Sequence, residues 1–147
     1  MIRAIIIDDE PQLRKSLAKL LSVHCPTVSI AGEAESVESA FEAIKRLQPD
    51  LIFLDIRMED GTGFDLLQKF DRINFHVIFV TAFEKYAIKA FHFSAIDYLL
   101  KPIDPEELIA AVEKLKSIIN TEIELRAATL LKDIGETGKQ SPLRVAL

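Results

Sequence analysis

The sequence is poor in cysteine, in glycine and in long hydrophobic runs. Its single cysteine, Cys25, cannot form a disulfide within the chain, so a reducing compartment such as the cytoplasm is the simplest expectation. The glycines do not form a glycine-rich phosphate loop, which excludes that nucleotide-binding motif. No apolar run reaches the roughly 18 residues that a membrane-spanning helix needs. The N-terminal run is ended by charge at Asp8, unlike a signal peptide.

Positive charge is also in deficit. A net charge of -5 and a pI near 5.2 argue against nonspecific nucleic-acid binding by this segment, because phosphate contacts require a basic face. The 147 residues are 49% hydrophobic and 28% charged, as in globular proteins. This length suits one domain that buries roughly two thirds of its unfolded surface.

Short apolar runs alternate with helical patterns along the chain. The runs are Ile2–Ile7, Val28–Ala31, Leu51–Leu54, Val77–Val80 and Ile96–Leu100. Each is typical of a strand buried on both faces of a parallel sheet. The helical patterns begin at Pro11 and near Ser36, then at Gly63, Glu84 and Pro105, the third ending near Phe70 and the fourth near Phe91. The sequence therefore predicts an α/β fold, a doubly wound five-stranded parallel sheet of the flavodoxin-like (βα)5 type.

The fifth helix is expected to be extended. Its pattern continues to about Lys132, beyond what covering one strand requires, so its distal turns are expected to meet a partner or a following domain. The glycines, serine and proline of "GETGKQSP", residues 135–142, then indicate a linker. The final "LRVAL" is expected to begin a second domain, with a frayed tail as the alternative.

Acidic residues follow two of the predicted strands. Asp8, Asp9 and Glu10 come directly after the first strand, and Asp55 follows the third. If these strands are neighbours, Asp8, Asp9 and Asp55 converge at one edge of the sheet. Two unit charges about 5 Å apart repel by roughly 3 kcal/mol at an effective dielectric near 20, so we expect Mg²⁺ or Mn²⁺ between them. The alternative is that Asp9 and Glu10 stabilise the N-terminus of the following helix.

Two further strand ends carry a hydroxyl and a cation. Thr81 ends the fourth predicted strand, and Lys101 follows the fifth. Beside the carboxylates, these groups could bind the oxygens of a phosphoryl group. Each residue alone has an ordinary structural explanation, but the four strand ends together form a specific pattern.

At these residues the sequence resembles the receiver domain of bacterial two-component response regulators, over about residues 2–119. The segments that carry the resemblance are "IIIDDEP", "LIFLDIRM", "FVTAF" and "DYLLKPID". The resemblance implies that Asp55 is the phosphorylated aspartate and that Asp8 and Asp9 bind the metal. It also implies that Thr81 and Lys101 contact the phosphoryl group.

The same resemblance assigns roles to several neighbouring residues. Arg57 would offer its backbone carbonyl to Mg²⁺, and Tyr98 would be the aromatic switch residue. Gly63 matches the glycine before the third helix, and the Lys101–Pro102 bond would be cis. Two positions depart from the family pattern: Glu59 replaces a frequent proline, and Ser94 replaces the glycine that usually precedes the fifth strand. The conformations of those two loops stay open.

The segment "TAFEKYAIKAFHFSAIDYLLKP", residues 81–102, looks like receivers that precede LytTR-type DNA-binding domains. The segment "SPLRVAL" is similar to the beginning of that domain. The expected organisation is a receiver domain over residues 1–119 and an extension of the fifth helix over 120–134. A linker and the start of a LytTR-type domain, most of it absent from this chain, would occupy 135–147.

The resemblance implies a phosphoacceptor signalling domain that catalyses only its own phosphorylation and dephosphorylation. Asp55 would take the phosphoryl group from a sensor histidine kinase, after which Thr81 and Tyr98 move. The expected readout is homodimerisation through the face of the fourth helix, fifth strand and fifth helix. DNA would be bound only through the missing C-terminal domain, and no membrane partner is expected.

Two other function classes stay open at this point. One is a Mg²⁺-dependent aspartyl phosphotransferase or phosphatase, although a second acid for the leaving group and a substrate-covering insertion are not visible. The other is a flavodoxin-like FMN-binding module, although the acidic first loop would repel phosphate.

Overall fold

The central element is one parallel sheet. The computed structural model describes residues 1–137, with side chains through residue 132. Five strands pair in the order β2-β1-β3-β6-β7, which confirms the predicted doubly wound, flavodoxin-like sheet. The strands are β1 (Ile2–Ile7), β2 (Val28–Ala34), β3 (Leu51–Leu54), β6 (His76–Thr81) and β7 (Asp97–Leu100).

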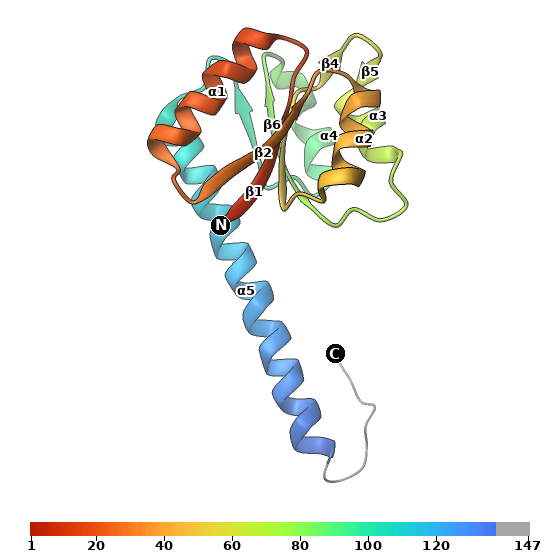
Figure 1. Ribbon diagram of the computed structural model, residues 1–147, viewed down its shortest axis with the longest axis vertical. Helices are drawn as coiled ribbons and strands as arrows, with labels where there is room; N and C mark the ends of the chain where they lie inside the picture. Colours follow the sequence, from red (N-terminus) through yellow and green to blue (C-terminus); the bar gives the residue numbers. More distant parts are fainter. Residues whose placement is uncertain (138–147) are drawn as a thin grey trace. The chain divides into compact units, whose positions relative to one another are not determined.

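Helices cover both faces of this sheet. They are α1 (Pro11–His24), α2 (Val37–Leu47), α3 (Gly63–Gln68), the 3₁₀ turn η1 (Glu84–Tyr86), α4 (Ala87–His92) and α5 (Pro105–Thr137). Figure 1 shows α1 on one face and α2, α3 and α4 on the other. Pro11 opens α1 at a position where its missing N–H costs nothing. Ser36 caps α2 through a reciprocal pair of bonds with Ser39.

Two interior strands, β1 and β3, are buried on both faces, which explains why their sequences are apolar apart from exposed Arg3. Ile5 and Ile7 of β1 pack with Ile52 and Leu54 of β3 in a cluster that includes α2 and α3. The alternate residues of both strands are also buried, toward the side of α1. Both strands end at the same edge, since Ile7 pairs with Leu54. The residue after each strand is an aspartate, so the core delivers two carboxylates to that edge.

Several element boundaries differ from the sequence prediction. Strand β2 continues to Ala34, beyond the end of the predicted run. Because it is an edge strand whose side chains are mostly half-buried, its second half carries no apolar run from which the strand could be predicted. Helix α3 ends at Gln68. The fourth helical segment begins as a 3₁₀ turn and becomes α-helical only at Ala87. A short hairpin, β4 (Arg57–Met58) with β5 (Gly61–Thr62), was not predicted because two-residue strands leave no periodic pattern.

Helix α5 runs to Thr137, so the first three residues of the predicted linker, 135–137, are helical instead. A single glycine in a helix costs roughly 1 kcal/mol relative to alanine and does not by itself end it. The rest of the predicted linker and domain start, residues 138–147, lies outside the described residues. The chain divides into two units, Met1–Val112 and Glu113–Leu147. Of the helices that the structure describes, none combines the length and apolarity required to cross a bilayer.

Candidate phosphoacceptor site

The candidate site lies at the carboxyl ends of four parallel strands. The Asp55 N–H donates to the carbonyl of Ile7 (3.0 Å), which fixes the end of β3 against the end of β1. On the other side, the Lys101 N–H donates to the carbonyl of Thr81 (2.9 Å). The sheet register thus brings the ends of β1, β3, β6 and β7 to one edge, as the sequence predicts.

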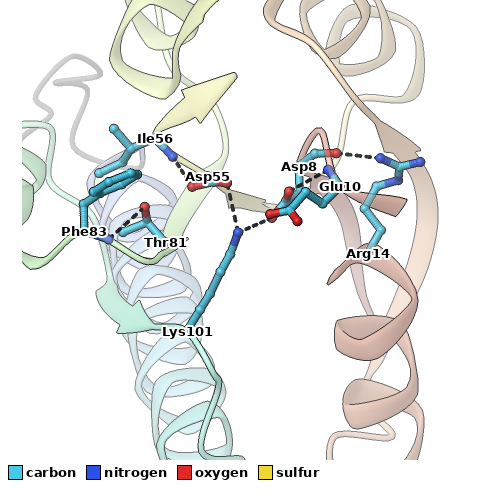
Figure 2. A network of polar contacts seen from close by, with 8 residues as sticks. All are labelled: Asp8, Glu10, Arg14, Asp55, Ile56, Thr81, Phe83 and Lys101. Atoms are coloured by element: carbon cyan, nitrogen blue, oxygen red, sulfur yellow. Dashed lines mark hydrogen bonds and ion pairs between the residues drawn. The ribbon is translucent and has the colours of Figure 1, made fainter. Parts of the chain in front are cut away.

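Lys101 lies between two buried carboxylates. Its Nζ is 2.7 Å from Asp8 Oδ2 and 3.0 Å from Asp55 Oδ2 (Figure 2). The three side chains are 12%, 7% and 8% exposed, in the order Lys101, Asp8, Asp55. Burial disfavours the charged ammonium, but the hydrogen bonds that it donates to both aspartates outweigh this effect and raise the pKa of Lys101. One ammonium therefore contacts two acids.

Asp55 is held by several donors in addition to Lys101. Its Oδ1 accepts from the backbone N–H of Ile56 at 2.7 Å. Burial raises the pKa of Asp55, and the hydrogen bond and charge of Lys101 offset this only in part. The hydroxyl of fully buried Thr81 also acts to lower that pKa. The arrangement presents a fixed carboxylate beside one cation and one hydroxyl.

Gly63 packs directly over the backbone of Asp55. A Cβ added at Gly63 would lie 2.5 Å from the carbonyl oxygen of Asp55 and 2.9 Å from Cγ of Leu54. The Gly63 N–H donates to the carbonyl of Ile56 at 2.7 Å, and Thr62 caps α3 through Asp65. Only glycine permits this close approach of α3 to the end of β3.

The predicted residues Arg57 and Tyr98 both contact the segment that follows β6. Arg57 Nη2 donates to the Tyr86 hydroxyl (3.1 Å), and its guanidinium lies 4.5 Å from the centre of the Phe83 ring. The Tyr98 hydroxyl donates to the carbonyl of Phe83. The Phe83 N–H in turn donates to Thr81 Oγ1 at 3.4 Å. Phe83 is thus the residue that the side chains of Arg57, Tyr98 and Thr81 all contact.

The acids after β1 form a compact group. Carboxylate oxygens of Asp8, Asp9 and Glu10 lie within 4.8 Å of one another. Asp55 joins this group through Lys101. Glu10 stands at the N-cap of α1 without a side-chain capping bond, so any stabilisation of the helix N-terminus by its carboxylate would be electrostatic. Asp8 Oδ1 accepts from the Glu10 N–H at 2.9 Å.

Comparison with known proteins decides the family. Residues 4–113 match the family model described as response regulator receiver domain. The chain belongs to this family. The predicted cis bond between Lys101 and Pro102 is present in this receiver domain. Ser94 has a φ of 59°, the left-handed conformation that glycine adopts more easily, so the loop keeps a glycine-like shape without glycine.

Curated relatives of this receiver domain are sensory transduction proteins. LytT of Enterococcus faecalis is 42% identical over 115 residues, which cover 77% of this chain and 47% of that protein. LytR of Staphylococcus epidermidis is 42% identical over 116 residues, covering 78% of this chain and 46% of that protein. The chain therefore spans about half the length of these relatives.

Two solved structures that match this fold are also domains of response regulators. The receiver domain of AraT from Geobacillus stearothermophilus is 30% identical with a TM-score of 0.74, covering 82% of this chain and 97% of that one. The response regulatory domain of mrkE from Klebsiella pneumoniae is 27% identical with a TM-score of 0.74, covering 82% and 99%. Both support the assignment of the flavodoxin-like fold.

Receiver domains in general bind Mg²⁺ at an acidic pocket and partner with histidine kinases. The donor set of this chain fits such an ion, because the three clustered side chains offer hard carboxylate oxygens, the ligands that Mg²⁺ prefers. Glu10 belongs to this cluster although the sequence prediction did not include it among the ligands. Arg14, Phe83 and Tyr86 were also not predicted, because their contacts depend on the fold and leave no local sequence signal.

Proposed function

We propose that Asp55 accepts a phosphoryl group from a phosphohistidine of a sensor kinase. The observation that supports this best is the position of the Lys101 ammonium, 3.0 Å from Asp55 and 2.7 Å from Asp8. A buried cation beside a buried carboxylate can neutralise the oxygens of an incoming phosphoryl group without reorganising water.

The proposed step is a displacement at phosphorus. A carboxylate oxygen of Asp55 forms the new P–O bond while the P–N bond to the histidine breaks, and the imidazole leaves with the electron pair and takes up a proton. Lys101 and the Thr81 hydroxyl stabilise the phosphoryl oxygens. Catalysis of this kind consists mainly of positioning and electrostatics.

Asp8, Asp9 and Asp55, together with the backbone carbonyl of Arg57, are the proposed metal ligands. Bound Mg²⁺ or Mn²⁺ supplies positive charge that stabilises the transferring phosphoryl group. In this proposal the chain itself contributes the acceptor, Asp55, and catalyses only its own phosphorylation and dephosphorylation.

The proposed output is a change on the surface that follows Thr81. Once Thr81 turns toward the phosphoryl group, its contact with the Phe83 N–H is lost, and the Tyr98 ring can turn into the vacated space when its own bond to the Phe83 carbonyl breaks. The adjacent α4 exposes Ile88 and Phe91, 76% and 79% accessible, a pair suited to homodimerisation. In a longer protein of the LytT type, we propose that this dimer controls a DNA-binding domain.

Incubation with acetyl phosphate and Mg²⁺ separates the three function classes. We expect a mass increase of one phosphoryl group per chain, absent in Asp55→Asn and in EDTA. Asp71→Asn, which removes an exposed acid on the loop after α3, is the matched control and retains the label. Sustained phosphate release with many turnovers would favour an aspartyl phosphatase, and a yellow purified protein would favour an FMN-binding module.

A further inference from the structure

Arg14, on the first turns of α1, connects three elements at the acidic edge. Its Nη1 donates to the backbone carbonyl of Asp8 at 2.6 Å, and its Nε donates to Glu33 Oε1 of β2 at 3.0 Å (Figure 2 shows the first contact). The Arg14 side chain is only 15% exposed. We propose that Arg14 is a positioning residue that fixes the acidic turn for divalent-cation binding, an inference that rests on the proposed function.

The contact acts on the peptide unit between Asp8 and Asp9. A peptide unit is planar, so holding the Asp8 carbonyl also fixes the direction in which the chain leaves toward Asp9. The other polar atoms of Asp8 already have partners. Its N–H donates to the carbonyl of Ala34, its Oδ1 accepts from the Glu10 N–H, and its Oδ2 contacts the Lys101 ammonium. Asp9 is exposed. The bond to Arg14 therefore decides where the Asp9 carboxylate stands relative to that of Asp8.

Besides the Glu10 N–H that donates to Asp8 Oδ1, the start of α1 contributes little to hold this turn. Helix α1 begins at Pro11, which has no N–H, and Glu10 forms no side-chain capping bond. The guanidinium fork can donate to a carbonyl and a carboxylate at once, whereas a lysine ammonium at this position is too short and compact to span both. Partners that orient metal ligands in this way typically change metal affinity 10- to 100-fold.

Two effects of Arg14 on cation binding have opposite signs. Its positive charge repels a divalent cation, so simple electrostatics predicts tighter binding when the charge is removed. Removing Arg14 also leaves the Glu33 carboxylate without its 3.0 Å partner, which would further attract a cation, so weaker binding can come only from lost positioning. The sign of the change in affinity thus distinguishes the two explanations.

The test is a titration of the whole chain with Mn²⁺, followed by the electron paramagnetic resonance signal of the free ion. Arg14→Met keeps the length of the side chain's apolar part and is expected to weaken binding about 10- to 100-fold. Arg14→Lys is expected to bind more weakly than wild type and more tightly than Arg14→Met. Lys15→Met, which removes an exposed positive charge from the same helix, is the control and keeps wild-type affinity or exceeds it slightly.

Phosphorylation by acetyl phosphate supplies a second readout. At saturating metal, Arg14→Met should recover its label, because Asp55, Thr81 and Lys101 are unchanged. Unchanged or tighter Mn²⁺ binding by Arg14→Met, or no label at saturating metal, would overturn the inference. If Arg14→Met does not fold, Arg14→Lys decides, and wild-type affinity in that variant is the contrary result. A wild-type chain that neither binds Mn²⁺ nor takes the label would instead reject the proposed function itself.

Discussion

Asp55, the proposed phosphoacceptor, lowers the stability of the fold. Its carboxylate is buried and shares the single Lys101 ammonium with Asp8. Burial raises the pKa of Asp55, which means that the folded state disfavours the charged carboxylate relative to the unfolded chain. At neutral pH, above the ordinary value of 3.8, this charge therefore reduces the stability of the fold.

Replacing Asp55 with asparagine is expected to stabilise the fold at pH 7 while abolishing the label. The amide removes the charge that is costly to bury, and Lys101 keeps its 2.7 Å contact with Asp8. Urea unfolding in EDTA measures the effect as a higher midpoint concentration. Asp71→Asn, at an exposed position, should change the unfolding free energy by less than about 0.5 kcal/mol. A lower midpoint for Asp55→Asn than for wild type contradicts this account of the site.

Asp60, which lies outside the site, makes the stability of the fold depend on pH. Its Oδ1 accepts from the Val37 N–H (2.8 Å) and its Oδ2 from the Glu38 N–H (3.1 Å), so the β4–β5 turn caps α2. The bond from Val37 is the main reason why the pKa of Asp60 lies below its ordinary 3.8. A lowered pKa favours the charged form in the folded state. The stabilisation is fully present above the ordinary value and is lost as the pH falls through it toward the lowered one.

Asp60→Asn is expected to reduce the unfolding free energy at pH 7 by less than about 1 kcal/mol, because the amide oxygen can still accept one of the two hydrogen bonds. Between pH 5 and pH 3, estimated as about one unit on each side of the ordinary value, the variant should lose less stability than wild type. Thermal unfolding across that range measures the difference. Glu59→Gln, the neighbouring exposed acid, is the control. Parallel pH profiles for wild type and Asp60→Asn would show that the cap does not contribute.

Helix α3 fixes the end of β3 through Gly63. A methyl group there would meet the Asp55 carbonyl oxygen at 2.5 Å, which is backbone and cannot rotate away. Gly63→Ala should therefore destabilise the chain by about 1–3 kcal/mol, the usual cost of overpacking, and slow the labelling of Asp55. Gly32→Ala is the matched control, since its new methyl would meet only Cδ1 of the flexible Leu47 side chain at 2.8 Å. Equal losses in both variants would contradict the role of Gly63.

Among the elements, burial decides what the sequence could predict. Strands β1 and β3 were predicted with correct ends because their residues are buried and apolar, with exposed Arg3 of β1 as the exception. Strand β2 was predicted too short because its second half, which includes exposed Glu33, carries no such pattern. The meeting of Asp8, Asp55 and Lys101 followed from strand ends at one edge. The contacts of Arg14 depend on exact spacing between elements, which periodicity does not encode.

The exposed face of α4 is the surface through which we propose that the protein dimerises after phosphorylation. Ile88 and Phe91 are two of the most exposed large apolar residues of the described chain. If this face forms the proposed homodimer, Phe91→Ser should weaken phosphorylation-dependent dimerisation at least about tenfold, since aromatic anchors contribute 2 kcal/mol or more in many interfaces. Sedimentation equilibrium with and without acetyl phosphate measures the change.

A surface control belongs with that experiment. Val23→Ser removes a large apolar side chain that is 62% exposed on α1, away from the proposed interface. Its dimerisation should match that of wild type. Phe91→Ser should also keep the label on Asp55, because Phe91 does not contact the site. An unchanged dimer in Phe91→Ser would reject this face as the interface.

The most direct test of the central claim is to locate the phosphoryl group on the chain. After treatment with acetyl phosphate and Mg²⁺, borohydride reduces an acyl phosphate on aspartate to homoserine, which peptide mass spectrometry assigns to a single residue. The account predicts homoserine at position 55, and none there when Lys101 is replaced by methionine. Homoserine at Asp8 or Asp9, or no homoserine in a wild-type chain that binds the metal, would contradict it.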